Sequence, residues 1–259
     1  MRKFLSAIRS GFGFLSTIPV GITMEGIENL MKHIYLFPVV GAVIGIIFAL
    51  IVIAITSLTT LPPIIVSLFV IIAIYYFTGF NHIDGLADFG DGLAAHGTKE
   101  KKIAAMRDTA IGTGGIVFCM IALLGVFVSL VSIQELDRFL LLPYALIVAE
   151  TSAKQSMVTV AAFGRRLHAG FGAMTVDNTK QSDLIIGTVF SAAVCFVVLG
   201  VTGIGAFIVS QLSGLLVLNT ANRHFGGVSG DVVGAANEIG RLAALLYIGS
   251  IGGAGWMLL

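Results

Sequence analysis

Residues 34–83 read IYLFPVVGAVIGIIFALIVIAITSLTTLPPIIVSLFVIIAIYYFTGFNHI, and they contain no Asp, Glu, Lys or Arg. A helix that crosses a bilayer needs about 20 predominantly apolar residues, so this run has room for two crossings. Of the 259 residues in the chain, 57% are hydrophobic and 11% are charged, whereas soluble domains have about 25% charged residues. The sequence therefore predicts an all-α, polytopic membrane protein that is embedded in a lipid bilayer.

Further apolar runs extend this pattern to seven predicted spans, which form one helical bundle over residues 1–259. We expect the spans at residues 35–56, 62–80, 112–133, 139–162, 184–202, 204–223 and 233–258. The turn between the fifth and sixth spans is marked only by small residues, namely Gly200, Thr202, Gly203 and Gly205. Glycines four residues apart, such as Gly41 and Gly45, permit close helix contacts and support a compact bundle.

The first 34 residues are too interrupted to cross a membrane. The cations Arg2, Lys3 and Arg9 stand beside apolar residues that fall on one helical face, a pattern typical of a helix that lies in the membrane interface. A secretory signal peptide is the alternative, but Arg9 interrupts its apolar region and no small-residue cleavage site follows. Residues 1–34 are therefore expected to form an interfacial segment before the first span.

A polar segment separates the second predicted span from the third, and residues 80–115 read FNHIDGLADFGDGLAAHGTKEKKIAAMRDTAIGTGG. If residues 81–95 form a helix, Asp84, Asp88 and Asp91 are spaced by four and three residues and project from one face. Like charges this close favour a bound cation, and an all-oxygen ligand set suits Mg2+, which is commonly shared with substrate phosphates. The row predicts a Mg2+ site formed by these three aspartates.

Three glycines, Gly85, Gly90 and Gly92, lie in the same stretch. Each weakens a helix by up to about 1 kcal/mol. A solvated face of a surface helix is the alternative interpretation of the aspartates, but such a helix gains nothing from glycine. Because glycine lets the backbone approach a ligand closely, we interpret this stretch as part of a ligand site.

Cations and a glycine-rich helix start follow the aspartate row. Lysines and arginines can bind phosphate oxygens, and the free amides at the N-terminus of a helix favour anions. None of these features is specific alone, but their order along the chain is uncommon. The candidates for phosphate contacts in this region are Lys99, Lys102, Arg107, Gly112 and Gly114.

Three motifs carry a resemblance to a known family. They are HIDGLADFGDGL at residues 82–93, MRDTAIGTGG at residues 106–115 and GGVSGDVVGAANEIGRL at residues 226–242. Along essentially its whole length the chain resembles the cobalamin synthases, or adenosylcobinamide-GDP ribazoletransferases, whose pattern is roughly HxDGLADxxDG, MRDSxxGTxG and GGxxGDxxGA. Thr109 stands where that family usually has Ser, and Phe80-Asn81 replaces Gly-Phe or Gly-Leu, but neither change removes a charged group.

The resemblance implies an enzyme that joins adenosylcobinamide-GDP to α-ribazole, or to its 5'-phosphate, and releases GMP in the last steps of cobalamin nucleotide-loop assembly. The implied partners are a corrinoid-GDP and a ribazole nucleoside, and the implied cofactor is Mg2+. The catalytic candidates are Asp84, Asp91 and Asp108, with Asp91 or Asp108 as the acceptor of the hydroxyl proton. Asp231, in the third motif, is implied as a metal ligand or substrate contact, with a helix cap as the alternative.

Two further groups of side chains have open roles. Arg165, Arg166 and His168 are candidates for contacts with the nucleotide, although an ordinary loop rich in basic residues has the same composition. His82 stands two residues before Asp84 and so lies off the carboxylate face. We expect it to pack or to contact substrate rather than to act as a base.

Ionisable residues also occur inside the predicted spans. A lone charge at the bilayer centre costs about 2.5–3.5 kcal/mol on insertion scales, so such residues are expected to pair. Glu150 and Lys154 are four residues apart, and Glu238 and Arg241 are three apart. Internal ion pairs that face the bundle explain both, and a functional role for the first pair is the alternative.

Two other classes of membrane protein fit part of the pattern. The DGxxA core and the spaced acids are similar to those of the CDP-alcohol phosphotransferases, but there an Arg stands where Asp88 follows Ala87 here. A cation or metabolite transporter would use Glu150 and Lys154 as a coupling pair. A transporter would, however, place its decisive acids near the bilayer midplane, whereas this chain concentrates them at one membrane face.

Seven alternating spans place the N-terminus and the polar segments 81–111, 164–183 and 223–232 on the same side. Twelve of the fifteen Lys and Arg residues lie on that side, and positively charged loops face the cytoplasm. We therefore expect a protein of the cell membrane whose active-site segment, residues 81–111, faces the cytoplasm. No interleaving of basic and aromatic residues indicates nucleic-acid binding, and the sequence leaves open whether the chain forms a homo-oligomer.

Overall fold

The computed structural model describes residues 2–137 and 139–251, and over these ranges it is all-α, as the sequence predicts. The helices are α1 (Arg2–Leu15), α2 (Met24–Met31), α3 (Leu36–Leu58), α4 (Pro63–Thr78), α5 (Asn81–Ala94), α6 (Lys99–Met106), α7 (Thr113–Leu136), α8 (Leu141–Phe163), α9 (Phe171–Asn178), α10 (Gln181–His224) and α11 (Gly230–Ile251). The part of the last predicted span at residues 252–258 lies outside the described residues, as does Arg138.

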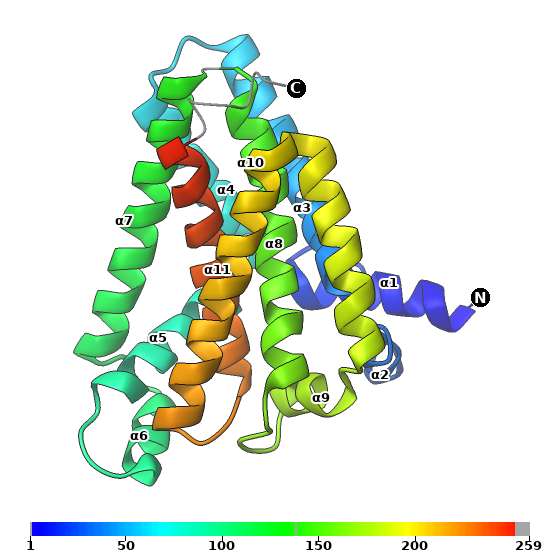
Figure 1. The fold of residues 1–259 in the computed structure, drawn as a ribbon, viewed down its shortest axis with the longest axis vertical. Coiled ribbons are helices and arrows are strands. Elements are labelled where there is room, and N and C mark those ends of the chain that lie inside the picture. Colours follow the sequence, from blue (N-terminus) through cyan, green and yellow to red (C-terminus); the bar gives the residue numbers. More distant parts are fainter. Residues whose placement is uncertain (1, 138, 252–259) are drawn as a thin grey trace.

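The central helix of the bundle is α8, which packs against α3, α10 and α11 (Figure 1). Nearly all of its residues are buried, including the polar side chains of Glu150, Thr151 and Lys154. A helix that its neighbours shield from lipid can carry such side chains, because they find partners inside the protein. This position explains how α8 can carry charged side chains in its middle.

Each predicted span has a helix at its position. By length and composition, α3, α7, α10 and α11 are apolar enough to cross a membrane, and the bent pair of α4 and α5 adds a fifth if it counts as one span. The prediction of a multi-pass helical bundle is confirmed at this level. The count of seven crossings stays a prediction.

The helix α10 consists of two arms. At Leu199 and Gly200 the backbone leaves the helical conformation, and Gly200 has a φ of 53°, which glycine adopts without the steric cost that other residues meet. Figure 1 shows α10 rising to this point and returning in the opposite direction. A Cβ at Gly203 would collide with the carbonyl oxygen of Cys195. The break therefore lies at Gly200, one of the small residues predicted to mark the turn, three residues before the predicted boundary at residue 203.

Close contact between α3 and α8 depends on two glycines. A Cβ at Gly41 would lie 2.6 Å from the carbonyl oxygen of Glu150, and a Cβ at Gly45 would lie 2.7 Å from the Cα of Ile147. Real Cβ atoms do not approach backbone this closely, so only glycine permits this helix spacing. The structure confirms the prediction made from the four-residue spacing.

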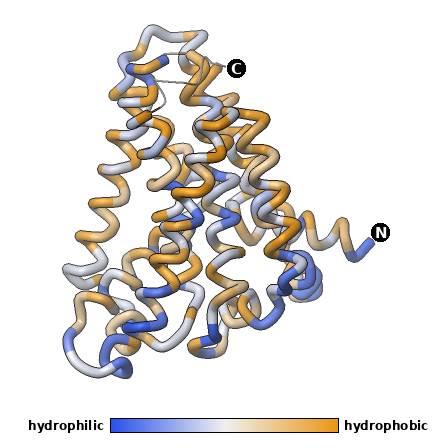
Figure 2. Tube along the Cα trace, in the orientation of Figure 1, coloured by the Kyte–Doolittle hydropathy of each residue, from blue (hydrophilic) through white to orange (hydrophobic). Residues whose placement is uncertain are grey.

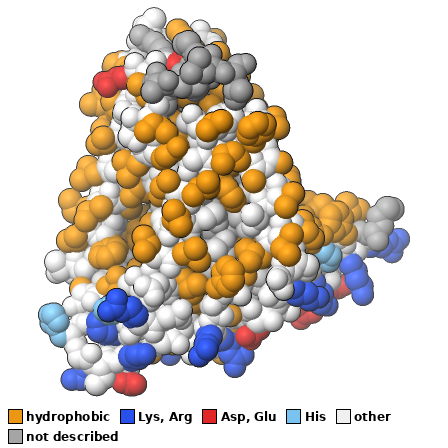
Figure 3. All heavy atoms as spheres, in the orientation of Figure 1, with side chains coloured by type: hydrophobic (Ala, Val, Ile, Leu, Met, Phe, Trp, Pro, Cys, Tyr) orange, Lys and Arg blue, Asp and Glu red, His pale blue; other side chains and the backbone are white. Residues whose placement is uncertain are grey.

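The chain bends by 95° between α4 and α5, and Gly79 provides the turn with a φ of 69°. The helix α5 therefore runs across the bundle near one end rather than along it (Figure 1), and we place it outside the spanning helices. Hydrophilic residues gather toward this end of the chain trace (Figure 2). On the face shown in Figure 3, Lys and Arg side chains gather at the same end, below a broad apolar surface.

The N-terminal helix α1 projects sideways from the bundle, across the direction of α3 and α8 (Figure 1). Its last residue, Leu15, is buried, whereas Phe4 and Leu5 are exposed. The segment that follows is tied to the end of α4, because the amide of Thr17 donates to the carbonyl oxygen of Phe77 at 2.8 Å. This orientation suits the interfacial segment predicted for residues 1–34.

Candidate active site

The aspartate row predicted for residues 81–95 lies on α5, and two of its members face a common cavity. Asp84 is exposed and Asp88 is half-buried, and both line a polar cavity of about 450 Å3. Other polar residues that line this cavity are Arg107, Asp108, Thr109, His168 and Asp231. The polar cavity therefore collects side chains from all three sequence motifs.

Asp91, the third member of the row, does not line the polar cavity. Its two carboxylate oxygens accept hydrogen bonds from the backbone amides of Gly112, at 2.7 Å, and Gly115, at 2.8 Å. These amides stand at the start of α7, where a helix leaves its donors free and its dipole favours negative charge. Asp91 therefore joins α5 to α7. Each of its oxygens keeps a second lone pair, so these bonds do not preclude a cation.

The same contact changes the interpretation of the glycine-rich helix start. The sequence predicts Gly112 and Gly114 as contacts for a substrate phosphate. In the structure the Gly112 amide donates to Asp91, and a Cβ at Gly114 would lie 2.6 Å from the carbonyl oxygen of Gly90. The anion at this helix start is thus a side chain of the protein, and the glycines allow α5 and α7 to pack.

The glycines of α5 also serve packing rather than contact with a ligand. A Cβ at Gly85 would lie 2.9 Å from the Cα of Asp231, and one at Gly90 would lie 2.9 Å from the backbone of α7. A Cβ at Gly92 would lie 2.9 Å from the ring of Phe225. The interpretation that these residues bring the backbone close to a ligand is therefore corrected: they bring α5 close to its neighbours, and so place Asp84 beside Asp231.

Three carboxylates of the polar cavity lack a cationic partner in the part of the chain that the structure describes. Within the described residues, none of Asp84, Asp88 and Asp231 forms an ion pair. Burial, with the charges of Asp231, Asp84 and Asp91, raises the pKa of Asp88 to about 7. Both causes disfavour the ionised form, so this group of carboxylates attracts a cation.

The carboxylates of the polar cavity fit a metal ion whose coordination shell is completed by a substrate. Within residues 2–137 and 139–251, no three His, Cys, Asp or Glu side chains converge to hold a metal, and the predicted trio is divided because Asp91 turns to α7. Asp84 and Asp88 nevertheless face the same cavity. Mg2+ typically takes one or two carboxylates and completes its shell with water and substrate phosphates. Two aspartates without a cationic partner match that requirement.

Among the predicted Lys and Arg contacts, Arg107 lines the polar cavity. The predicted contacts that do not line it are Lys99, Lys102, Arg165 and Arg166. Two of these have partners elsewhere: the Lys102 amine lies 3.0 Å from Nδ1 of His224, and Arg166 forms an exposed ion pair with Asp177 at 2.9 Å. His224 is 122 residues from Lys102 in the sequence, whereas Asp177 is 11 residues from Arg166, in the same polar segment.

His168 reaches the polar cavity from the loop between α8 and α9. The loop is held by backbone hydrogen bonds from Leu167 to Val228 at 2.9 Å and from Val228 to Arg165 at 2.7 Å. The Nδ1 atom of His168 lies 3.0 Å from the carbonyl oxygen of Ala169. Its Nε2 atom is buried and has no hydrogen-bond partner within the described residues. His168 is thus better placed than its two neighbouring arginines to contact a ligand.

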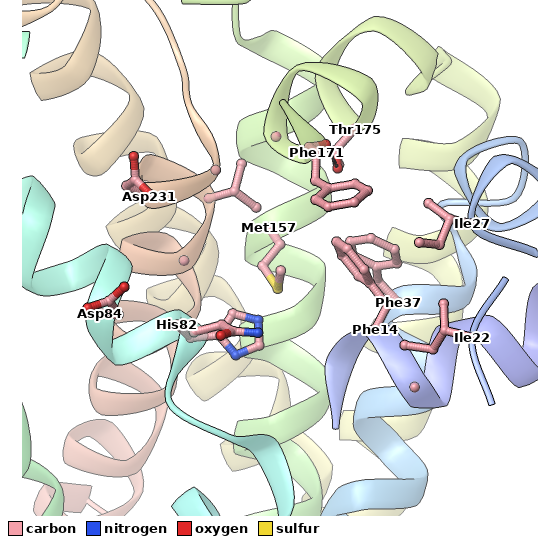
Figure 4. Close-up of a pocket in the computed structure, with 16 residues that line it drawn as sticks. Phe14, Ile22, Ile27, Phe37, His82, Asp84, Met157, Phe171, Thr175 and Asp231 are labelled. Atoms are coloured by element: carbon pink, nitrogen blue, oxygen red, sulfur yellow. Dashed lines mark hydrogen bonds between the residues drawn. The ribbon is translucent and has the colours of Figure 1, made fainter. Parts of the chain in front are cut away.

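A second, largely apolar cavity of about 550 Å3 adjoins the polar one. Phe14, Phe37 and Phe171 line it from three different helices (Figure 4), and we refer to it as the aromatic cavity. Asp84 and Asp231 line both cavities, so the two share a wall. Sequence reasoning missed this site, because its rings come from α1, α3 and α9 and share no motif.

The charges inside the bundle form one buried network. Glu150 accepts from Lys154 at 2.8 Å and from Arg241 at 2.5 Å, and Arg241 donates to Glu238 at 2.7 Å. Tyr75 donates to Glu238 at 2.9 Å. Both predicted ion pairs are confirmed, and the contact between Glu150 and Arg241 joins them across α8 and α11. A network of this kind, with each charge paired, fits a structural role better than a transporter's coupling site.

The fold and the cavities define a multi-pass helical membrane protein with a carboxylate-rich site at one end of its bundle. The chain belongs to the cobalamin-5-phosphate synthase family, whose sequence model matches residues 7–249. Proteins named adenosylcobinamide-GDP ribazoletransferase from Methanosarcina barkeri and Methanosarcina mazei are 44% and 43% identical to it, with 100% of each chain covered. The protein of that name from Methanococcoides burtonii is 41% identical over 96% of this chain and 93% of its own. No solved structure matches the chain.

Proposed function

We propose that this chain is an adenosylcobinamide-GDP ribazoletransferase that joins the corrinoid to α-ribazole, or to its 5'-phosphate, and releases GMP. The observation that carries the proposal is the polar cavity, which gathers residues of all three motifs at one site. The full-length relation to proteins of that name supports it. A CDP-alcohol phosphotransferase is less well supported, because the second and third motifs contribute to the same cavity as the first.

The reaction is a substitution at a phosphorus atom. The ribose 3'-hydroxyl oxygen of ribazole forms a bond to the phosphorus next to cobinamide, and the bond from that phosphorus to the oxygen of the leaving GMP breaks. Such a transfer needs alignment of the reacting groups and neutralisation of charge on the phosphate oxygens. Arg107 lines the polar cavity, and its guanidinium is suited to bind those oxygens.

Asp108 is the better candidate for the acceptor of the hydroxyl proton. It is exposed in the polar cavity, and one of its oxygens accepts from the amide of Ala110 at 3.0 Å. Asp91, the other candidate, uses both oxygens to accept bonds from α7. A general base must lie within reach of the proton that it takes, and Asp108 lines the polar cavity and would take the proton without breaking a contact between helices.

Asp84 and Asp88 would hold Mg2+, with Asp231 beside them. When bound, the ion would neutralise the charge on the diphosphate and its leaving group. His168 would contact a phosphate oxygen through its unpartnered Nε2 atom. The gathering of cationic side chains at the same end of the bundle supports a cell-membrane protein whose polar cavity faces the cytoplasm.

The direct test uses the purified full-length protein in detergent or lipid nanodiscs. Adenosylcobinamide-GDP, α-ribazole and Mg2+ are mixed with it, and the GMP released is measured. Matched reactions replace the corrinoid with a CDP-alcohol, omit ribazole, or add a chelator in excess of Mg2+. We expect GMP only when both substrates and the metal are present. GMP release no higher than that of the Asp84→Asn variant would remove the proposal.

A further inference from the structure

The aromatic cavity has the size and lining of a site for a flat ring. Its volume of about 550 Å3 lies within the range of about 300–1,000 Å3 typical of small-molecule sites. The ring centroids of Phe14 and Phe37 are 6.1 Å apart, and so are those of Phe14 and Phe171. Three aromatic side chains thus form one continuous wall, against which another aromatic ring can pack.

One buried polar side chain at this cavity has a ring nitrogen without a hydrogen-bond partner in the described part of the chain. His82 is 8% exposed, lines the cavity and has no hydrogen-bond partner for Nδ1 within the described residues. The hydroxyl of Thr175, another polar group of the lining, already donates to the carbonyl oxygen of Phe171 at 3.0 Å. A buried imidazole nitrogen without a partner costs free energy, so a ligand atom that pairs with it would be favoured.

The position of His82 relates the cavity to the reacting groups. Figure 4 shows His82 and Met157 between two sets of side chains, with Asp84 and Asp231 on one side and the phenylalanine rings on the other. A ligand with an aromatic end among the rings would therefore place its opposite end at the shared wall. That wall belongs to the polar cavity as well, where we place the phosphoryl group.

We infer that the aromatic cavity binds the fused heteroaromatic base of the ribazole nucleoside, with the Nδ1 hydrogen of His82 donating to the imine-type nitrogen of that base. This inference rests on the proposed function and identifies which cavity receives which substrate. The ribose then lies at the wall formed by Asp84 and Asp231, with its attacking hydroxyl directed to the polar cavity. The diphosphate of the corrinoid substrate binds in the polar cavity and not in the aromatic cavity.

The chemistry of the lining favours this base over the other aromatic base in the reaction. A benzimidazole base in a nucleoside has an apolar body and one free ring nitrogen, which matches one imidazole donor among phenylalanine, isoleucine and methionine side chains. Guanine carries several donors and acceptors along its edges, and leaving these unpaired in an apolar site is costly. The guanylyl group is therefore assigned outside the aromatic cavity.

Equilibrium binding separates this inference from the proposed function. Purified wild-type protein is titrated with α-ribazole alone and, in a separate experiment, with adenosylcobinamide-GDP alone. The test variants are Phe171→Ala, which opens the cavity at a half-exposed residue, and Ile22→Trp, which fills it. Phe163→Ala is the matched control, because Phe163 is exposed at the end of α8 and does not line the cavity. Thermal unfolding in detergent checks that each variant is folded.

We expect both test variants to weaken ribazole binding by about tenfold or more and to raise its KM, with affinity for adenosylcobinamide-GDP changed by less than about twofold. Phe163→Ala should behave as wild type. Unchanged ribazole binding in folded variants, or weakened binding of the corrinoid instead, would overturn the inference while GMP release by wild type still stood. Wild-type protein that neither binds ribazole nor releases GMP would reject the proposed function as well.

Discussion

The carboxylate of Asp91 accepts a hydrogen bond from the backbone amide of Gly112 at 2.7 Å. This bond links the acidic helix α5 to the start of α7, although the two residues belong to different motifs. Asp91 is therefore separated in role from Asp84 and Asp88, which face the polar cavity. The distinction can be tested by comparing the stability and the activity of variants at the three positions.

Asp91→Ala should destabilise the protein by about 1–2 kcal/mol, the range for loss of a side chain that caps a helix. The amides of Gly112 and Gly115 would lose their acceptor, and α7 would be less firmly held against α5. Unfolding in detergent measures the change. Asp84→Ala is the control, because Asp84 is exposed and makes no such bond. Equal stability of the two variants would contradict the role given to Asp91.

Asp84→Asn and Asp88→Asn should each lower the rate of GMP release by about a hundredfold or more. Each removes a carboxylate that would hold the metal, and the metal would in turn neutralise and orient the phosphates. At pH 6 their stability should stay close to that of wild type, since neither side chain forms an ion pair in the described structure. The measurement is GMP release at saturating substrates. Activity retained by both variants would show that the metal lies elsewhere.

The pKa of Asp88, raised to about 7, predicts a dependence of stability on pH in metal-free protein. A carboxyl group whose pKa is higher in the folded state stabilises that state while it is protonated, and the stabilisation is lost as pH rises through about 7. Thermal unfolding in the presence of a chelator should therefore show a lower Tm at pH 8 than at pH 6. Asp88→Asn should reduce this difference, and Mg2+ should restore the Tm of wild type at pH 8.

Arg241→Gln should cost about 3–5 kcal/mol of stability, because it leaves Glu238 without its cation and removes one of the two cations that pair with Glu150 inside the bundle. The matched control is Arg166→Gln, which breaks an exposed ion pair with Asp177 and should change stability by less than about 1 kcal/mol. Denaturant titration in mixed micelles compares the two. Similar losses in both variants would argue against a structural role of the buried network.

Gly85→Ala should lower activity by about tenfold or more while the protein stays folded. The added methyl group would lie 2.9 Å from the backbone of Asp231, so α5 and α11 must separate, and a shift of about 1 Å in catalytic groups is enough for such a loss. Gly249→Ala is the control, because its nearest contact would be an ordinary 3.4 Å. GMP release by the two variants gives the comparison.

Local patterns were sufficient for much of the fold. The helix over residues 81–95, the break at Gly200 and the pairing of Glu150 with Lys154 each depend on residues close in sequence, and each is present in the structure. The hydrophobic runs placed the long helices within a few residues of their ends. Such features follow from helical periodicity and from the cost of burying a charge.

Features that depend on tertiary contacts could not be predicted in this way. The turn of Asp91 toward α7 and the contact between Glu150 and Arg241 join segments many residues apart. The packing of Gly85 against the backbone of Asp231 could not be predicted for the same reason. A single sequence shows which residues have chemistry to offer, but packing decides which of them meet.

The wall that Asp84 and Asp231 contribute to both cavities also has a consequence for product release. If each substrate binds in its own cavity, the product would extend through both the polar and the aromatic cavity. It would have to leave both before either substrate could bind again. The product would then compete with ribazole for the aromatic cavity and with the corrinoid substrate for the polar cavity. Turnover would be governed by departure of the product rather than by the bond that forms it.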